Sequence, residues 1–218
     1  MIDLNRAPDE MDWEMLRLSG LTGRRGFRMG RRVRSGLGLI PRRLPGLGEI
    51  WKQRMDEAEL HARIDSIHEP YHRALAECLQ GLRARWGAAL LIDMHSMPPL
   101  VRRWHDEPVQ QFVLGDRFGG TCDGALCAAA FEVFARENRR AAHNRPYAGG
   151  YVLERHSAPS RGLHAMQIEI CRSTYLDSRL TEPHEGVDDV AGLFAGMVRR
   201  LASEVAGLGG ASQLPQAA

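Results

Sequence analysis

The stretch Ala88-Ala-Leu-Leu-Ile-Asp-Met94 decides the fold class, because a short apolar run that ends in polar residues is typical of a buried strand. Before it, apolar residues spaced by three and four predict a long helix over residues 57–86, which Pro70 should kink or divide. Further strands are expected at residues 111–114, 150–153 and 165–170, and further helices at residues 124–136 and 187–205. Strands that alternate with helices predict an α/β fold with a largely parallel or mixed sheet flanked by helices.

Length and composition are those of one globular domain. The chain has 218 residues, of which 44% are hydrophobic and 26% are charged, and its net charge is +2. These values exclude disordered, collagen-like and disulfide-dense proteins, so we expect one domain over residues 1–206 and a disordered tail over residues 207–218. The four cysteines form no CxxC pair, which predicts reduced thiols rather than a structural zinc knot.

Two sequence features bear on location and partners. No apolar run approaches the roughly 20 residues of a membrane helix and no apolar signal segment opens the chain, so we expect a soluble, cytoplasmic protein without a membrane partner. Residues 20–48 are rich in arginine and glycine with little apolar periodicity, which predicts a loop or lid outside the core. Phe27 is the only aromatic residue within this segment, so nucleic-acid binding is not favoured.

A first polar cluster follows the predicted strand near residue 94. On an extended chain Asp93 and His95 point to the same side, so the carboxylate can orient or polarise a group that the imidazole holds. The alternative is a histidine at a strand end that simply hydrogen-bonds its neighbours.

A second polar cluster lies in the strand predicted near residues 165–170. Alternation puts Gln167 and Glu169 on one face and apolar residues on the other. A carboxylate in so apolar a strand is costly unless it is paired or hydrogen-bonded. Two interpretations stay open: a structural ion pair of Glu169 with Arg172 or Arg155, or a general base beside a metal.

Between these clusters, Asn144-Arg-Pro-Tyr147 and Gly149-Gly150 predict a turn in which the backbone can approach a ligand closely. Arg155 follows and could bind a carboxylate in bidentate fashion, although a plain turn and a surface arginine explain the same residues. The sequence contains no GxSxG elbow, no P-loop and no GxGxxG motif followed by a helix.

A set of short strings occurs in one order along the chain and resembles the N-formylglutamate amidohydrolase family. They are Ile2-Asp-Leu-Asn-Arg6, Arg34-Ser-Gly-Leu-Gly-Leu-Ile-Pro41, Glu69-Pro-Tyr-His72, Asp93-Met-His-Ser-Met-Pro98, Leu114-Gly-Asp-Arg117, Asn144-Arg-Pro-Tyr147 and Gly162-Leu-His-Ala-Met-Gln-Ile-Glu169. This resemblance implies a carboxypeptidase-like, phosphorylase/hydrolase-like α/β fold, related to zinc carboxypeptidases and aspartoacylases.

The resemblance also implies an activity and a set of site residues. It implies a mononuclear zinc hydrolase that converts N-formyl-L-glutamate, or a related small anionic N-acyl amino acid, to the free amino acid and formate, the last step of one histidine-degradation route. By resemblance, His95 is a zinc ligand with Asp93 behind it, and Glu169 is the catalytic carboxylate. The residues implied to bind substrate are Asn5, Arg6, Asn144 and Arg155.

One departure from the family pattern concerns the metal. The family's first metal ligands and first strand precede the Asp-Leu-Asn-Arg string, which begins here at Asp3, so the resemblance implies an N-terminally incomplete domain with weakly bound or absent zinc. One hypothesis is a shortened reading of a longer enzyme, and the other is an inactive relative that binds a ligand or partner without zinc. Loss of a strand would expose apolar surface, so a homo-oligomer is also expected.

Overall fold

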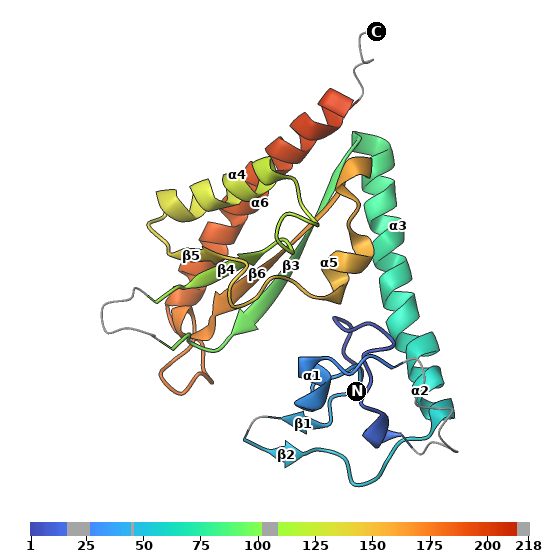
Figure 1. Cartoon of the computed structure of the whole chain (residues 1–218). Helices are drawn as coiled ribbons and strands as arrows, with labels where there is room; N and C mark the ends of the chain where they lie inside the picture. Colours follow the sequence, from blue (N-terminus) through green and yellow to red (C-terminus); the bar gives the residue numbers. More distant parts are fainter. Residues whose placement is uncertain (17–26, 45, 102–108, 213–218) are drawn as a thin grey trace. The chain divides into compact units, whose positions relative to one another are not determined.

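The computed structural model describes residues 1–16, 27–44, 46–101 and 109–212, and it divides the chain into two units, Met1–Glu77 and Cys78–Ala218 (Figure 1). The single domain that the sequence predicts over residues 1–206 stays a prediction. The boundary between the two units falls inside the helix α3 (Glu69–Trp86). Because the apolar periodicity of this helix continues across the boundary, the sequence alone does not indicate it.

A four-stranded mixed sheet organises the second unit (Figure 1). In spatial order the strands are β3 (Ala89–Met97), β6 (Leu163–Cys171), β4 (Phe112–Gly115) and β5 (Ala141–His143). The pairs β3–β6 and β4–β5 are parallel, whereas β4 and β6 are antiparallel. The prediction of an α/β fold with a mixed sheet flanked by helices is therefore confirmed.

One face of this sheet carries the main core of the second unit. The helices α4 (Gly124–Arg136) and α6 (Gly186–Ser212) pack here, and their apolar residues share one cluster with alternate residues of the strands. The ring of Phe112 stacks on that of Phe134 at 4.8 Å between centroids. Because side chains alternate across a strand, the polar residues of β6 are left for the opposite face.

The opposite face of the sheet is more polar and lies toward α5 (Tyr151–His156), which contacts β3 and β6 (Figure 1). Two short 3₁₀ turns border β6, namely η4 (Pro159–Arg161) before it and η5 (Arg172–Thr174) after it. The strand predicted at residues 150–153 is wrong, because α5 occupies these residues. A four-residue apolar run has too little length to distinguish a strand from a helical turn.

The first unit is built from short elements. They are η1 (Trp13–Met15), α1 (Arg31–Arg34), the antiparallel pair β1 (Arg43–Leu44) and β2 (Gly48–Glu49), α2 (Glu57–Arg63), the π-helical turn η3 (Ile64–His68) and the start of α3. The predicted division of the long helix is confirmed: the π turn ends at His68, two residues before Pro70, which lacks the N–H that an α-helical hydrogen bond requires.

The prediction that residues 20–48 lie outside the core is wrong in part. Val33, Leu39 and Ile40 are completely buried, and the last two belong to the core cluster of the first unit, together with Met11 and Leu16. Gly and Arg residues surround this short apolar segment, so the sequence does not show that it belongs to a core. Residues 17–26 and 45 lie outside the described part of the chain.

The tail predicted to be disordered from residue 207 is helical as far as Ser212, while residues 213–218 lie outside the described residues. Close backbone contacts hold this end of α6. A Cβ on Gly87 would lie 2.6 Å from the Gly209 carbonyl oxygen, and a Cβ on Gly162 would lie 2.6 Å from the Gly87 oxygen. Gly87, Gly162 and Gly209 thus allow three backbone segments to pack closely. The composition of the tail alone does not predict this packing.

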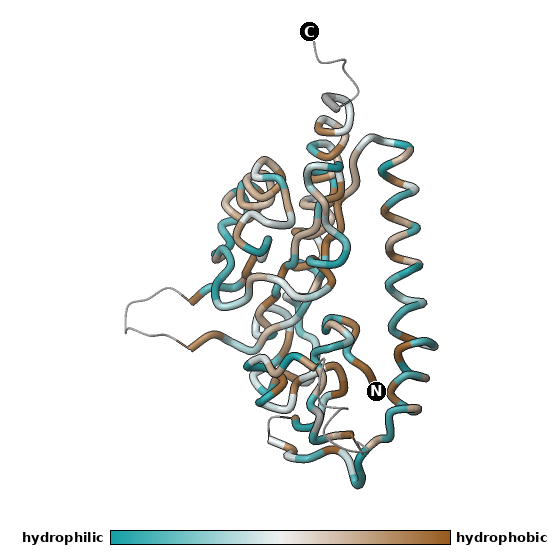
Figure 2. The backbone as a smooth tube through the Cα atoms, turned by 45° about the vertical axis from the view of Figure 1, so that its right-hand side comes forward, coloured by the Kyte–Doolittle hydropathy of each residue, from teal (hydrophilic) through white to brown (hydrophobic). Residues whose placement is uncertain are grey.

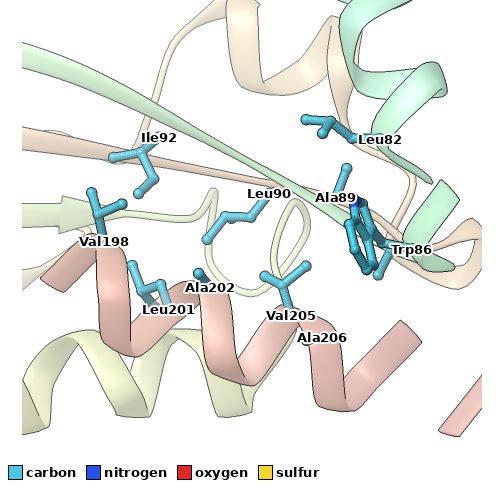
Figure 3. A pocket seen from close by; sticks show the side chains of 11 residues that line it. Leu82, Trp86, Ala89, Leu90, Ile92, Val198, Leu201, Ala202, Val205 and Ala206 are labelled. Carbon is cyan, nitrogen blue, oxygen red and sulfur yellow. The ribbon is translucent and has the colours of Figure 1, made fainter. Parts of the chain in front are cut away.

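An apolar groove of about 380 Å³ lies between α3, β3 and α6 (Figure 3). Its lining includes Leu82, Trp86, Leu90, Ile92, Val198 and Val205. Polar and apolar residues alternate along α3 (Figure 2), and Trp86 is 54% exposed.

Among the described residues, no helix has the length and apolar character needed to cross a membrane.

Candidate functional site

The two polar clusters predicted from the sequence are neighbours in the structure. In the parallel pair β3–β6, Asp93 lies opposite Gln167 and His95 lies opposite Glu169. Register partners on adjacent parallel strands project from the same face, so the four side chains occupy one patch near the carboxyl ends of both strands. Ligands of α/β sheets bind beyond such strand ends.

Hydrogen bonds order this patch. His95 Nε2 lies 2.9 Å from Asp93 Oδ2, and Gln167 Nε2 donates to Glu169 Oε1 at 2.8 Å. Glu169 is only 8% exposed, so this donor offsets part of the cost of burying its carboxylate. The amide oxygen of Gln167 is buried without a hydrogen-bond partner in the described structure. The patch therefore holds a buried carboxylate beside an imidazole, with an acceptor left for a further donor.

Arg155 lies on α5, the helix that contacts both strands of the patch. Its Nη1 donates to the Tyr151 hydroxyl at 2.9 Å, and its guanidinium carbon lies 5.8 Å from the centre of the Tyr151 ring. Burial, and then the charge of Arg155, lower the pKa of the neighbouring His156 to about 4, so that imidazole is neutral at pH 7. Burial also lowers the pKa of His164 at the start of β6.

The Asp-Leu-Asn-Arg string lies in the first unit and is held there by two histidines. The buried rings of His68 and His72 donate through Nε2 to the backbone oxygens of Arg6 and Leu4, at 2.9 and 3.0 Å. Sequence reasoning missed this role, although two histidines four residues apart lie on the same side of a helix.

Arg6 is 9% exposed. Its Nε donates to the Leu37 oxygen at 3.2 Å, and its Nη1 donates to the Asn5 oxygen at 2.6 Å. Burial lowers the pKa of Arg6, which nevertheless stays charged at neutral pH, and Asp3 Oδ2 lies 3.8 Å from its Nε. Asn5 donates its backbone N–H to Asp3 Oδ1 at 2.8 Å. The string is thus a half-buried turn that carries one buried cation, Arg6.

Several arginines of residues 20–48 have acidic partners within the first unit. Arg42 Nε lies 2.8 Å from Asp12 Oδ2, and Arg28 Nε lies 2.7 Å from Asp9 Oδ2. Arg43 Nε lies 2.6 Å from Glu49 Oε1. These pairs give Arg28, Arg42 and Arg43 a local structural role, and Arg24 and Arg25 lie outside the described residues.

Asn144 holds the turn that follows β4. Its Oδ1 accepts the backbone N–H of Asp116 at 3.0 Å, and its Nδ2 donates to Asp116 Oδ1 at 2.7 Å. Burial opposes ionisation of Asp116, but the hydrogen bonds from Asn144 and from the Gly119 N–H lower the pKa of Asp116 overall. Asn144 therefore positions this turn, and its implied role in substrate binding stays a prediction.

We expect Asn144→Ala to lower the free energy of unfolding by about 1–3 kcal/mol, because it leaves the buried polar groups of Asp116 without their partner. Asn138→Ala is the matched control, since Asn138 has a similar left-handed backbone (φ 51° against 60°) and is exposed. Urea unfolding of both variants measures the difference. Equal losses of unfolding free energy in the two variants would contradict the prediction. They would show that backbone strain, and not the side-chain hydrogen bonds of Asn144, determines the loss.

One group of metal-binding side chains stands out in the described part of the chain. Asp116, Cys127 and His143 each offer one ligand atom, and these atoms lie within 4.8 Å of one another. No group of three such ligands among the described residues includes His95. Sequence reasoning missed the cluster, because its members are far apart in the chain and match no metal-binding spacing.

Comparisons with known proteins agree with the motifs. The family model described as N-formylglutamate amidohydrolase matches residues 1–176. The N-formylglutamate deformylase of Pseudomonas aeruginosa is 30% identical over 181 residues, which are 82% of this chain and 62% of that protein. The deformylase of Pseudomonas putida is 32% identical over 130 residues, or 59% of this chain and 48% of that protein. The chain thus spans less than two thirds of the length of these curated relatives.

Solved structures show the same relationship. The N-formylglutamate amidohydrolase of Ralstonia eutropha superposes with a TM-score of 0.75 at 29% identity, covering 97% of this chain and 74% of that one. A gene product of Agrobacterium tumefaciens, at 19% identity and a TM-score of 0.61 over 93% of this chain and 66% of that one, shares the fold. From the ordered motifs, the fold and the family match over residues 1–176, the chain belongs to the N-formylglutamate amidohydrolase family.

Proposed function

We propose that the protein hydrolyses the amide bond of N-formyl-L-glutamate, or of a closely related N-acyl amino acid, to the free amino acid and a carboxylate. The observation that carries this proposal is the buried carboxylate of Glu169 opposite His95, at the carboxyl ends of two parallel strands. The relatives named as N-formylglutamate deformylases support the choice of substrate.

Glu169 acts as general base and then as general acid. Its carboxylate removes a proton from water, whose oxygen forms a bond to the formyl carbon while an electron pair moves onto the carbonyl oxygen. The electron pair then returns, the C–N bond breaks, and the proton passes from Glu169 to the leaving nitrogen. The products are formate and glutamate.

Two neighbours position these groups. Gln167 Nε2 donates to Glu169 Oε1, which fixes the orientation of the carboxylate that receives the proton. Asp93 Oδ2 lies 2.9 Å from Nε2 of His95 and orients the imidazole beside Glu169. The residues proposed to bind the substrate carboxylates and amide are Asn5, Arg6, Asn144 and Arg155, in which the guanidinium groups match carboxylates by charge and shape.

The zinc ion implied by the family does not fit the described residues around His95. A catalytic zinc needs about three protein ligands, and the described side chains near His95 do not assemble such a set. No proton transfer in the proposed reaction therefore depends on a metal. The same observation favours a second candidate function, in which the protein binds N-acyl amino acids without turnover.

One experiment separates the two functions. The purified protein is incubated with N-formyl-L-glutamate, released formate is measured enzymatically, and heats of binding are measured by calorimetry. Formate release above the rate in buffer is the expected result. Binding heat without formate would support the second function, and the absence of both would contradict the two proposals together.

A further inference from the structure

We propose that Asp116, Cys127 and His143 form a binding site for a thiophilic divalent cation such as Zn²⁺, which shares no ligand with the pair of His95 and Glu169. The three residues come from three elements: Asp116 directly follows β4, Cys127 lies near the N-terminus of α4, and His143 ends β5. The strands β4 and β5 are parallel, with Leu114 opposite His143, so their carboxyl ends meet at the cluster.

The distances suit a tetrahedral ion. His143 Nε2 lies 3.1 Å from Asp116 Oδ1, and the Cys127 thiol lies 3.3 Å from Asp116 Oδ2. Ligand atoms around one tetrahedral zinc lie roughly 3.3–3.8 Å apart, because each bond measures about 2.0–2.3 Å. One ligand atom of each residue lies within 4.8 Å of the other two, so side-chain rotation has to bring the three atoms closer together around one ion.

Neighbouring groups hold the ligands in place. Asn144 Nδ2 and the Gly119 N–H both donate to Asp116 Oδ1, at 2.7 and 3.1 Å. The ring of Phe131 meets the His143 ring edge-on at 5.4 Å. Such supporting contacts fix the orientation of metal ligands and raise metal affinity.

The chemistry of the three donors selects the ion. A thiolate, an imidazole and a carboxylate form a mixed, partly soft set that prefers Zn²⁺ to Mg²⁺ or Ca²⁺. Asp116 and Cys127 are buried, whereas the His143 side chain is 45% exposed, so an ion and a water for its fourth position can enter from solvent. On binding, the cation replaces the Cys127 thiol proton, which passes to solvent.

The cluster differs in position from the pair of His95 and Glu169. Because β4 is antiparallel to β6, the carboxyl end of β4 points the opposite way along the sheet from the carboxyl end of β6. In this register Val113 lies opposite Glu169 and Gly115 lies opposite Gln167, so Asp116 follows at the Gln167 end. The cation proposal rests on its own three ligands and does not depend on the proposed hydrolysis.

The test uses the full chain carrying Cys78→Ser, which removes an exposed thiol that could bind metal. We expect calorimetric titration with Zn²⁺ alone to show one bound equivalent. Cys127→Ser and His143→Gln should each weaken binding by more than about tenfold. His95→Gln should leave this binding unchanged, which separates the site from the pair of His95 and Glu169.

Titration with Co²⁺ alone gives a second readout, because only a sulfur ligand produces a thiolate-to-cobalt charge-transfer band. The band should vanish in Cys127→Ser and persist in Cys171→Ser. His143→Gln changes an exposed side chain, and circular dichroism verifies that each variant is folded. Unchanged zinc affinity in both Cys127→Ser and His143→Gln, or no charge-transfer band before substitution, would overturn the proposal.

Discussion

Glu169→Gln is expected to lower kcat for N-formyl-L-glutamate by roughly 10²–10⁴-fold, the usual contribution of a general base. The amide keeps the size of the side chain and can still contact Gln167, but it cannot accept a proton from water. Because the lost interaction acts in the transition state, KM should change much less than kcat. Steady-state assays of formate release measure both constants.

The matched control for this variant is Glu185→Gln, which removes one negative charge from an exposed position in the same unit. It should retain the full rate. A kcat of Glu169→Gln close to that of the control would contradict the role of general base, provided that circular dichroism shows both variants folded.

The second large effect concerns stability. Phe112→Ala should lower the free energy of unfolding by about 3–5 kcal/mol, because it removes a completely buried ring and leaves a cavity between the sheet and its helices. The lost contacts include the stacked Phe134 ring and the edge of Phe194, whose centroid lies 6.2 Å away. Guanidinium unfolding followed by circular dichroism gives the free energy.

Phe118→Ala is the control for that measurement, since Phe118 is 71% exposed and loses little contact on truncation. We expect it to change stability by less than about 0.5 kcal/mol. Similar losses for both phenylalanines would mean that the core of the second unit is not centred on β4.

The fold could be predicted from the sequence where the pattern is local and long. Alternation in β6 and the apolar run of β3 predict strands, and the helical periodicity of α4 and α6 predicts helices that the structure confirms. Strand order and the antiparallel pairing of β4 with β6 depend on contacts between distant segments, which a local pattern does not carry. The three-residue strand β5 is too short to show any period.

The candidate site could be predicted only in pieces. Alternation places Asp93 beside His95 and Gln167 beside Glu169, but the register of β3 against β6 is what joins the two pairs. The interaction of Asn144 with Asp116 depends on how the turn after β4 folds back, so the sequence alone indicates a turn and not its partner.

The apolar groove between α3, β3 and α6 affects which probe can follow the unfolding of this protein. Dyes that fluoresce in apolar surroundings bind such grooves in a folded protein as well as the surfaces that unfolding exposes. A dye-based melting curve of this protein would begin from a bright folded baseline, and a variant that altered the groove would shift the signal without a change in stability. Backbone ellipticity follows the helices and strands themselves, and the groove leaves that signal unaffected.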